Sequence, residues 1–143
     1  MVLHHIGMLT DDIEAAAARL RESFGYEAVS ETIADPVQTA LVRFLKLPSS
    51  KEYLELVCPD GENSKLSKAL KKGVTLHHVC YQVRDIAAEL GRLRSLGYLT
   101  LCEPVAAAAF PGRRIAWCMD ASRNLVELLE RGGDENAALF VKD

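Results

Sequence analysis

The sequence predicts an α+β protein built from two copies of one β-α-β-β-β module. The first observation is an internal repeat, in which residues 3–31 resemble residues 76–104. The second is the change of apolar spacing within each copy, from the alternation of a strand to the period of a helix and back. The identical pairs that lie 73 positions apart include Leu3/Leu76, His4/His77, His5/His78, Asp12/Asp85, Ile13/Ile86 and Leu20/Leu93.

A one-residue deletion then changes the offset to 72, which pairs Gly25 with Gly97, Tyr26 with Tyr98 and Glu31 with Glu103. The same offset carries the run YLELV at 53–57 onto LVELL at 125–129 and pairs Glu55 with Glu127. We therefore expect a single domain over residues 1–143, made of modules at about 2–58 and 75–130. A linker helix is expected at about 63–73, ended by Gly73.

Each module is expected to begin with a short strand and continue with an amphipathic helix. The first helix has Asp11 as its expected N-cap and ends at Gly25, and the second runs from Asp85 to Gly97. The prolines are expected between strands or at their ends. The tail 131–143 has a weak pattern and receives no assignment. The expected strands are 2–8, 27–33, 39–47 and 52–58 in the first copy, and 76–83, 99–103, 113–119 and 124–130 in the second.

Composition excludes several classes of protein. The chain has 143 residues, of which 49% are hydrophobic and 26% charged, as in ordinary globular proteins. Its net charge of −3 disfavours nucleic acid as a partner, and no apolar run is long enough for a membrane span. The N-terminus lacks the basic start of a signal peptide. The cysteines form no CxxC pair, and we expect them to be reduced and buried in a cytoplasmic protein: Cys58, Cys80, Cys102 and Cys118.

Two His–Glu pairs carry the chemical signal. Strand alternation places His5 and His78 on the open face of each sheet, whereas His4 and His77 point to the helix side and receive structural roles. Glu55 and Glu127 each interrupt an apolar final strand, where a carboxylate is costly to bury unless it is paired or bound to a cation. Two imidazoles and two carboxylates suit a divalent transition metal.

The alternative is that each His is a hydrogen-bonded structural residue and each Glu faces solvent on an edge strand. Such roles are common for one isolated pair. The recurrence of both residues at matched positions favours the metal site.

The motifs LHHIG at 3–7, LEL at 54–56, LHHV at 76–79 and VEL at 126–128 resemble the vicinal oxygen chelate superfamily. That superfamily includes glyoxalase I, methylmalonyl-CoA epimerase, extradiol dioxygenases and bleomycin-resistance proteins. The resemblance implies that the paired modules form a cup-shaped sheet of eight strands around a metal site. It places His5, Glu55, His78 and Glu127 on the metal-ligand positions. The linker and second His-His look most like methylmalonyl-CoA epimerases, although the loop at 104–114 departs from their Gly-rich pattern.

The resemblance implies a metal-dependent isomerase or lyase that moves a proton next to the carbonyl of a small 2-oxo or acyl-thioester substrate. The metal would be Zn, Ni, Co or Mn. Glu127 is the expected base, and Glu55, which is also a ligand, is the alternative or second base. Strand alternation at the offset of 72 places Gln38 and Arg114 on the inner face as substrate-binding residues. The alternative is that Arg113 and Arg114 are solvated loop charges. The expected partner is a small-molecule substrate, and the expected assembly, if the chain associates, is a homodimer.

Two other functions are alternatives for this sequence. A bleomycin-resistance-like protein would sequester a ligand without catalysis, but such proteins usually lack the full ligand set. An extradiol-type dioxygenase would hold iron with two His and one carboxylate, and the fourth ligand at Glu55 argues against it.

Overall fold

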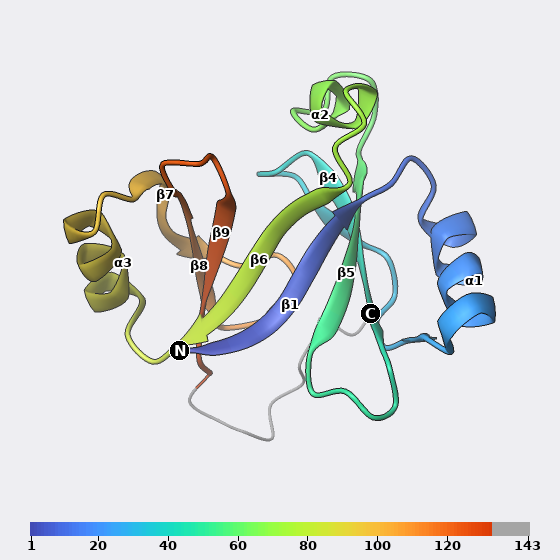
Figure 1. Cartoon of the computed structure of the whole chain (residues 1–143), viewed down its shortest axis with the longest axis horizontal. Helices are drawn as coiled ribbons and strands as arrows, with labels where there is room; N and C mark the ends of the chain where they lie inside the picture. The colour runs from blue at the N-terminus through green and yellow to red at the C-terminus, as the bar shows by residue number, and fades with distance from the viewer. Residues whose placement is uncertain (133–143) are drawn as a thin grey trace. The chain divides into compact units, whose positions relative to one another are not determined.

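A computed structural model describes residues 1–132, so the tail that received no assignment lies, from residue 133 on, outside the described residues (Figure 1). Backbone contacts divide the chain into two units. The N-terminal unit is His5–His77, and the C-terminal unit joins Met1–His4 to the described residues from His78 onward. Among the helices described, none has the length and apolar character needed to span a membrane. The predicted α+β class is confirmed in the elements of each unit.

The N-terminal unit follows the predicted order, with one strand broken in two. Strands β2 and β3 both pair with β4 in antiparallel fashion, β4 pairs with β5, and β1 runs parallel to β5. The break lies at Ser30, whose hydroxyl accepts the amide hydrogen of Phe44 at 2.9 Å in place of a backbone carbonyl. The elements are β1 (Val2–Leu9), α1 (Ile13–Phe24), β2 (Glu27–Ala28), β3 (Ile33–Asp35), β4 (Ala40–Lys46), β5 (Tyr53–Pro59) and α2 (Ser67–Lys71).

Helix α1 begins one residue later than expected. Asp12, rather than Asp11, is its N-cap, and its carboxylate accepts a hydrogen bond from the amide of Ala15 at 2.9 Å. The helix ends at Gly25, whose φ of 78° favours glycine. Ile13 and Ala16 pack against an apolar cluster from the strands: Leu45, Leu54 and Leu56.

The C-terminal unit repeats the arrangement with strand order β6-β9-β8-β7. Strand β6 is parallel to β9, and the other two pairings are antiparallel. Helix α3 begins near Asp85, as predicted, with Asp85 as its N-cap, and it lies against β7, β8 and β9 (Figure 1). Its buried residues Ile86, Leu90 and Leu93 pack on Ala116, Cys118 and Leu128. The elements are β6 (Leu76–Val83), α3 (Ile86–Ser95), β7 (Leu99–Ala106), β8 (Arg114–Met119) and β9 (Leu125–Glu130).

Strand β7 is longer than predicted and contains a proline. It continues through Pro104 to Ala106, so the expectation that every proline lies between strands or at their ends is wrong here. The register of β7 on β8 shifts between Thr100 and Cys102 and again between Cys102 and Val105. Pro104 lies within the second shift, and proline is tolerated where a strand is last in its sheet or bulged.

The four cysteines carry free thiols, in agreement with the expectation of reduced residues. Cys80 and Cys118 are buried, whereas Cys58 and Cys102 are partly exposed, so the expectation of burial is wrong for the latter two. Burial raises the pKa of the Cys118 thiol and makes it a weak nucleophile at neutral pH.

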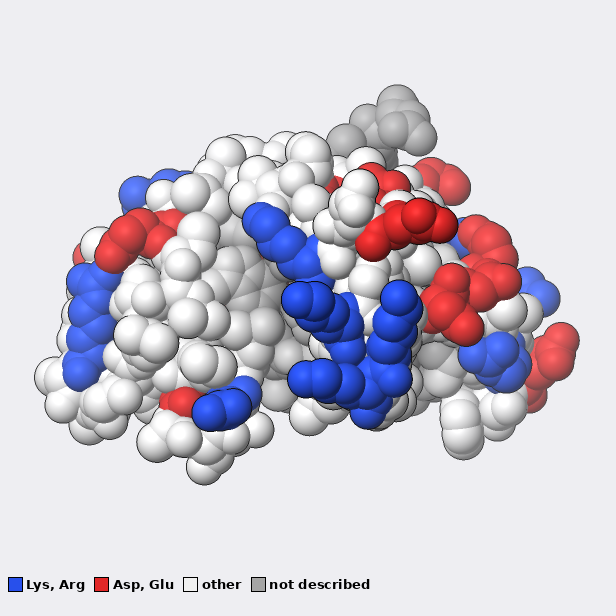
Figure 2. Space-filling view, turned by 90° about the horizontal axis from the view of Figure 1, so that it is seen from above, with Lys and Arg blue, Asp and Glu red and all other residues white. Residues whose placement is uncertain are grey.

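Basic side chains gather around α2. The segment 63–75 contains four exposed lysines and no acidic residue: Lys65, Lys68, Lys71 and Lys72. Figure 2, which looks down on the molecule from above, shows a cluster of Lys and Arg side chains on this face. The acidic net charge of the chain therefore coexists with a local basic surface.

The helix-to-sheet core predicts a test of stability. Leu90 lies on the buried face of α3 and is 1% exposed, whereas Leu96, the C-cap of the same helix, is 63% exposed. Leu90→Ala should lower the free energy of unfolding by about 2–5 kcal/mol, because it removes buried methyl groups and leaves a cavity. Leu96→Ala, the matched control, should change it by less than about 0.5 kcal/mol. Urea denaturation followed by circular dichroism measures both, and equal losses would contradict the packing described.

Candidate metal and proton-transfer site

Each unit contains one buried His–Glu pair. In the N-terminal unit, Nε2 of His5 lies 3.5 Å from a carboxylate oxygen of Glu55. In the C-terminal unit, Nε2 of His78 lies 3.5 Å from a carboxylate oxygen of Glu127. All four side chains are buried. The two pairs therefore share geometry as well as sequence position.

Strand register gives each glutamate the same two neighbours. Glu55 lies beside Gly7 on the parallel strand β1 and opposite Phe44 on the antiparallel strand β4. Glu127 lies beside Cys80 on β6 and opposite Trp117 on β8. A small residue on one side leaves room for the carboxylate, and an aromatic residue on the other side shields it from solvent. Each unit thus builds the same local surroundings from different residues.

The aromatic residues also fix the histidine rings. The ring of His5 meets Phe44 edge to face, with centroids 5.3 Å apart. The ring of His78 meets Trp117 in the same way at 4.8 Å. Such T-shaped contacts favour one ring orientation over others. They hold Nε2 of each histidine near its glutamate.

The donor atoms fit a divalent ion. A separation of 3.5 Å exceeds a typical N–H···O hydrogen bond of about 2.7–3.2 Å. Two ligands bonded to one ion at about 2.0–2.2 Å each, at angles between 90° and tetrahedral, lie about 3.0–3.5 Å apart. Imidazole nitrogen and carboxylate oxygen are the ligand types that Zn and related metals accept. Within each unit, the residues present therefore fit half of a metal coordination sphere.

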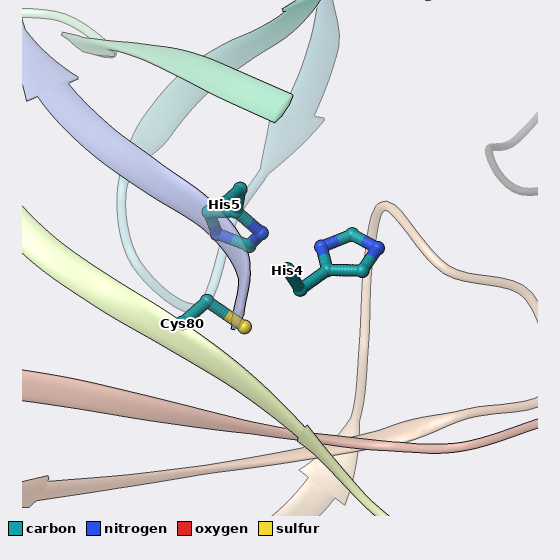
Figure 3. A group of neighbouring side chains, drawn as sticks. All are labelled: His4, His5 and Cys80. Carbon is teal, nitrogen blue, oxygen red and sulfur yellow. The ribbon is translucent and has the colours of Figure 1, made fainter. Parts of the chain in front are cut away.

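His4 occupies a different environment from His5. Figure 3 shows the two adjacent side chains of β1 leaving the strand in different directions, together with Cys80 of β6. The His4 ring packs edge-on against Phe110 at 5.3 Å, which agrees with a structural role. Its nearest ligand nitrogen also lies within 4.8 Å of the Cys80 sulfur.

The predicted inner face of β8 is wrong by one residue. Ala116 and Cys118 pack under α3, whereas Trp117 contacts His78, so Arg114 lies on the helix side and Arg113 on the site side. The guanidinium of Arg114 is exposed and bonds both carboxylate oxygens of Glu130, at 2.7 and 2.6 Å. These bonds hold the pKa of Glu130 below its usual range. The substrate-binding role of Arg114 stays a prediction.

Gln38 belongs to the turn before β4. Its backbone amide donates to one carboxylate oxygen of the buried Asp35 at 2.9 Å, and its side-chain amide donates to the other at 3.2 Å. These bonds close the turn between β3 and β4. The predicted contact of Gln38 with substrate stays a prediction.

Sequence reasoning missed two residues of this region, Trp117 and Arg113, and it gave no role to Phe44, which it placed on the inner face of β4. The offset of 72, applied to β8, places Trp117 on the helix-side face with the core residues. The offset of 73, which already pairs His5 with His78, would have paired Phe44 with Trp117. That coincidence of two aromatic residues was the available signal.

Comparisons with known proteins identify the family of this chain. Residues 4–117 match the model of the Glyoxalase/Bleomycin resistance protein/Dioxygenase superfamily. The ethylmalonyl-CoA/methylmalonyl-CoA epimerase of Cereibacter sphaeroides is 38% identical over 97 residues, which are 66% of this chain and 70% of that protein. The mitochondrial methylmalonyl-CoA epimerase of Homo sapiens is 31% identical over 105 residues, which are 72% of this chain and 58% of that protein.

Solved structures give the same result. The crystal structure of methylmalonyl-CoA epimerase from Mycobacterium tuberculosis matches with a TM-score of 0.82 and 28% identity, covering 96% of this chain and 92% of that one. An epimerase is an isomerase, so the predicted enzyme with isomerase chemistry is confirmed at that level. The match over residues 4–117 makes this chain a member of the Glyoxalase/Bleomycin resistance protein/Dioxygenase superfamily.

Proposed function

We propose that this chain is a divalent-metal-dependent epimerase of acyl-CoA thioesters, which moves a proton at the carbon next to the thioester carbonyl. The observation that carries the proposal is the pair of equivalent, buried His–Glu contacts, one in each unit. The substrate class comes from relatives whose names specify ethylmalonyl-CoA and methylmalonyl-CoA.

In this proposal His5, Glu55, His78 and Glu127 hold one divalent ion of Zn, Ni, Co or Mn. A bound ion would stabilise the negative charge that develops on the carbonyl oxygen as the proton leaves. The four ligands carry two negative charges when both carboxylates are ionised, which balances a divalent cation. That balance supports the proposal, because a buried carboxylate without a cation is costly.

The glutamates also move the proton. Glu127 is the proposed base, since its carboxylate is buried beside Trp117 in a water-poor environment where proton transfer competes less with solvent. Glu55 has the same surroundings in the other unit and is proposed as the second acid–base group. An epimerase removes a proton from one face of the carbon and returns one to the other face. Two equivalent carboxylates suit that requirement.

Metal content gives the first test. Purified protein should bind about one divalent ion per chain, and His78→Ala should weaken binding by at least about tenfold because it removes a ligand. His77→Ala, the neighbouring residue on the opposite strand face, is the matched control and should retain the metal. Elemental analysis after dialysis against each metal measures the ratio. Equal binding by the wild type and His78→Ala would remove His78 from the ligand set.

Proton exchange gives the second test. The metal-loaded wild type should exchange the α-proton of methylmalonyl-CoA with deuterium oxide, as followed by NMR. Glu127→Gln should slow exchange by about 10²- to 10⁴-fold, the usual size of a general-base contribution, while binding metal only modestly less well. Glu130→Gln, on the same strand but bonded to Arg114, is the control and should exchange at the wild-type rate. Full exchange by a metal-loaded Glu127→Gln would place the base elsewhere.

The effect of Glu55→Gln separates two reaction types. An epimerase should lose interconversion of the two epimers about as severely as with Glu127→Gln, because each face of the carbon needs its own group. A glyoxalase-type reaction, with one dominant base, should lose less. The rates of both variants are measured on the same metal-loaded samples. A wild type that binds a thioester and exchanges nothing would favour the ligand-sequestering alternative instead.

A further inference from the structure

Arg113 is a buried cation on the site side of the C-terminal sheet. It is 7% exposed and immediately precedes β8. It shares a strand face with Trp117, the residue that contacts His78. Neither the proposed metal ligation nor the proposed proton transfer uses it.

The guanidinium of Arg113 lacks an anionic partner in the part of the chain that the structure describes. Its Nη1 is buried with no hydrogen-bond acceptor. Arg43, Arg92, Arg94 and Arg114, by contrast, each form an ion pair with a glutamate. A guanidinium presents five N–H donors in a planar fork and stays charged at any physiological pH. Burying such a group without a partner is strongly unfavourable, so the arrangement is explained if an anion completes it.

The backbone is shaped to accept this guanidinium. A Cβ added at Gly132 would lie 2.9 Å from Nε and 3.2 Å from Nη2 of Arg113. Glycine at this position therefore lets the guanidinium lie flat against the chain just after β9. On the other side, the amide of Arg113 donates to the carbonyl of Phe110 at 3.1 Å, which fixes the turn from which its side chain leaves.

We propose that Arg113 binds an oxyanion of the substrate at a distance from the reacting carbon. Trp117 lies directly opposite Glu127, and Arg113 lies four residues earlier on the strand, about 13 Å away at about 3.3 Å per residue. A planar carboxylate or a phosphate matches the two-pronged geometry of the guanidinium. In methylmalonyl-CoA the acyl carboxylate is bonded to the reacting carbon, so the distant position of Arg113 favours a CoA phosphate, and the carboxylate is the alternative that the test below distinguishes. The identity of the anion rests on the proposed function, whereas the existence of the anion site does not.

Binding measurements with three thioesters distinguish the source of the anion. Methylmalonyl-CoA has an acyl carboxylate and phosphates, propionyl-CoA lacks the carboxylate, and methylmalonyl-pantetheine lacks the nucleotide phosphates. If the anion is the carboxylate, Arg113→Gln should raise the Kd of both methylmalonyl thioesters about 10- to 100-fold and leave propionyl-CoA unchanged. If it is a phosphate, the two CoA thioesters should weaken and the pantetheine thioester should not. Equal Kd values for wild type and variant with all three thioesters would overturn the proposal.

Companion variants separate an anion site from a structural role. Arg113→Lys keeps the charge and should recover part of the affinity. Gly132→Ala keeps both the charge and the side chain but displaces the guanidinium, and should weaken the same thioesters. Arg92→Gln removes an exposed arginine of α3 with the same change of net charge, and should bind like the wild type. Loss of affinity in Arg92→Gln equal to that in Arg113→Gln would assign the effect to net charge and reject the site.

A readout without thioesters keeps the two proposals distinguishable. Malonate and inorganic phosphate, titrated separately, should raise the Tm of the wild type more than that of Arg113→Gln. If no thioester binds the wild type but this difference in Tm is present, the proposed function fails and the anion site stands. If neither anion stabilises the wild type more than the variant and no thioester distinguishes them, the anion site is rejected whatever the exchange activity.

Discussion

The burial of one carboxylate in the middle of a sheet, repeated in both units, is the constraint on which the rest of the structure depends. Glu55 and Glu127 lie in strands whose alternate residues form the core beneath a helix. The apolar residues of those strands secure the sheet, and the same alternation turns each glutamate to the opposite face. The residues that stabilise the fold and the residues that supply the chemistry are therefore neighbours on one strand, and neither set can shift without the other.

Parallel strand pairing brings each histidine beside its glutamate. Each first strand of a module lies parallel to its last strand, which brings a residue near the start of the module beside one near its end. Parallel neighbours need a long connection, and here the helix and the two middle strands provide it. A His and a Glu separated by about 50 residues in the sequence consequently come within 3.5 Å in each unit.

The class of the fold, the position of each helix and the two His–Glu pairs could be predicted because they depend on periodicity and repetition. The predicted face of β8 is wrong, because its one signal in the sequence is the pairing of Phe44 with Trp117 at the offset of 73. Phe44 and Glu55 are 11 positions apart, whereas Trp117 and Glu127 are 10 apart, so the β8–β9 connection is one residue shorter than its counterpart. Loop residues carry no periodic pattern that would locate such a deletion. Because side chains alternate along a strand, an alignment error of one residue assigns every residue to the opposite face. Arg114 was therefore predicted on the site side, where the structure has Arg113.

The break between β2 and β3 has a similar origin. A serine inside a run of strand-like residues gives no warning that its hydroxyl will take the place of a backbone acceptor, because that bond depends on the facing strand. Strand β7 shows the opposite effect. Local preference would place its proline in a turn, but the strand continues through that proline because of its position in the sheet.

The irregular register of β7 also affects how the protein behaves among other copies of itself. This strand is last in its sheet and exposes Leu99, Leu101 and Val105, the composition of a strand that could recruit another chain. Pro104 has no backbone N–H to donate, and the two register shifts interrupt the regular pattern of the strand. An incoming strand would find no continuous ladder to extend. The features that make β7 hard to predict are thus those that guard the sheet against edge-to-edge aggregation.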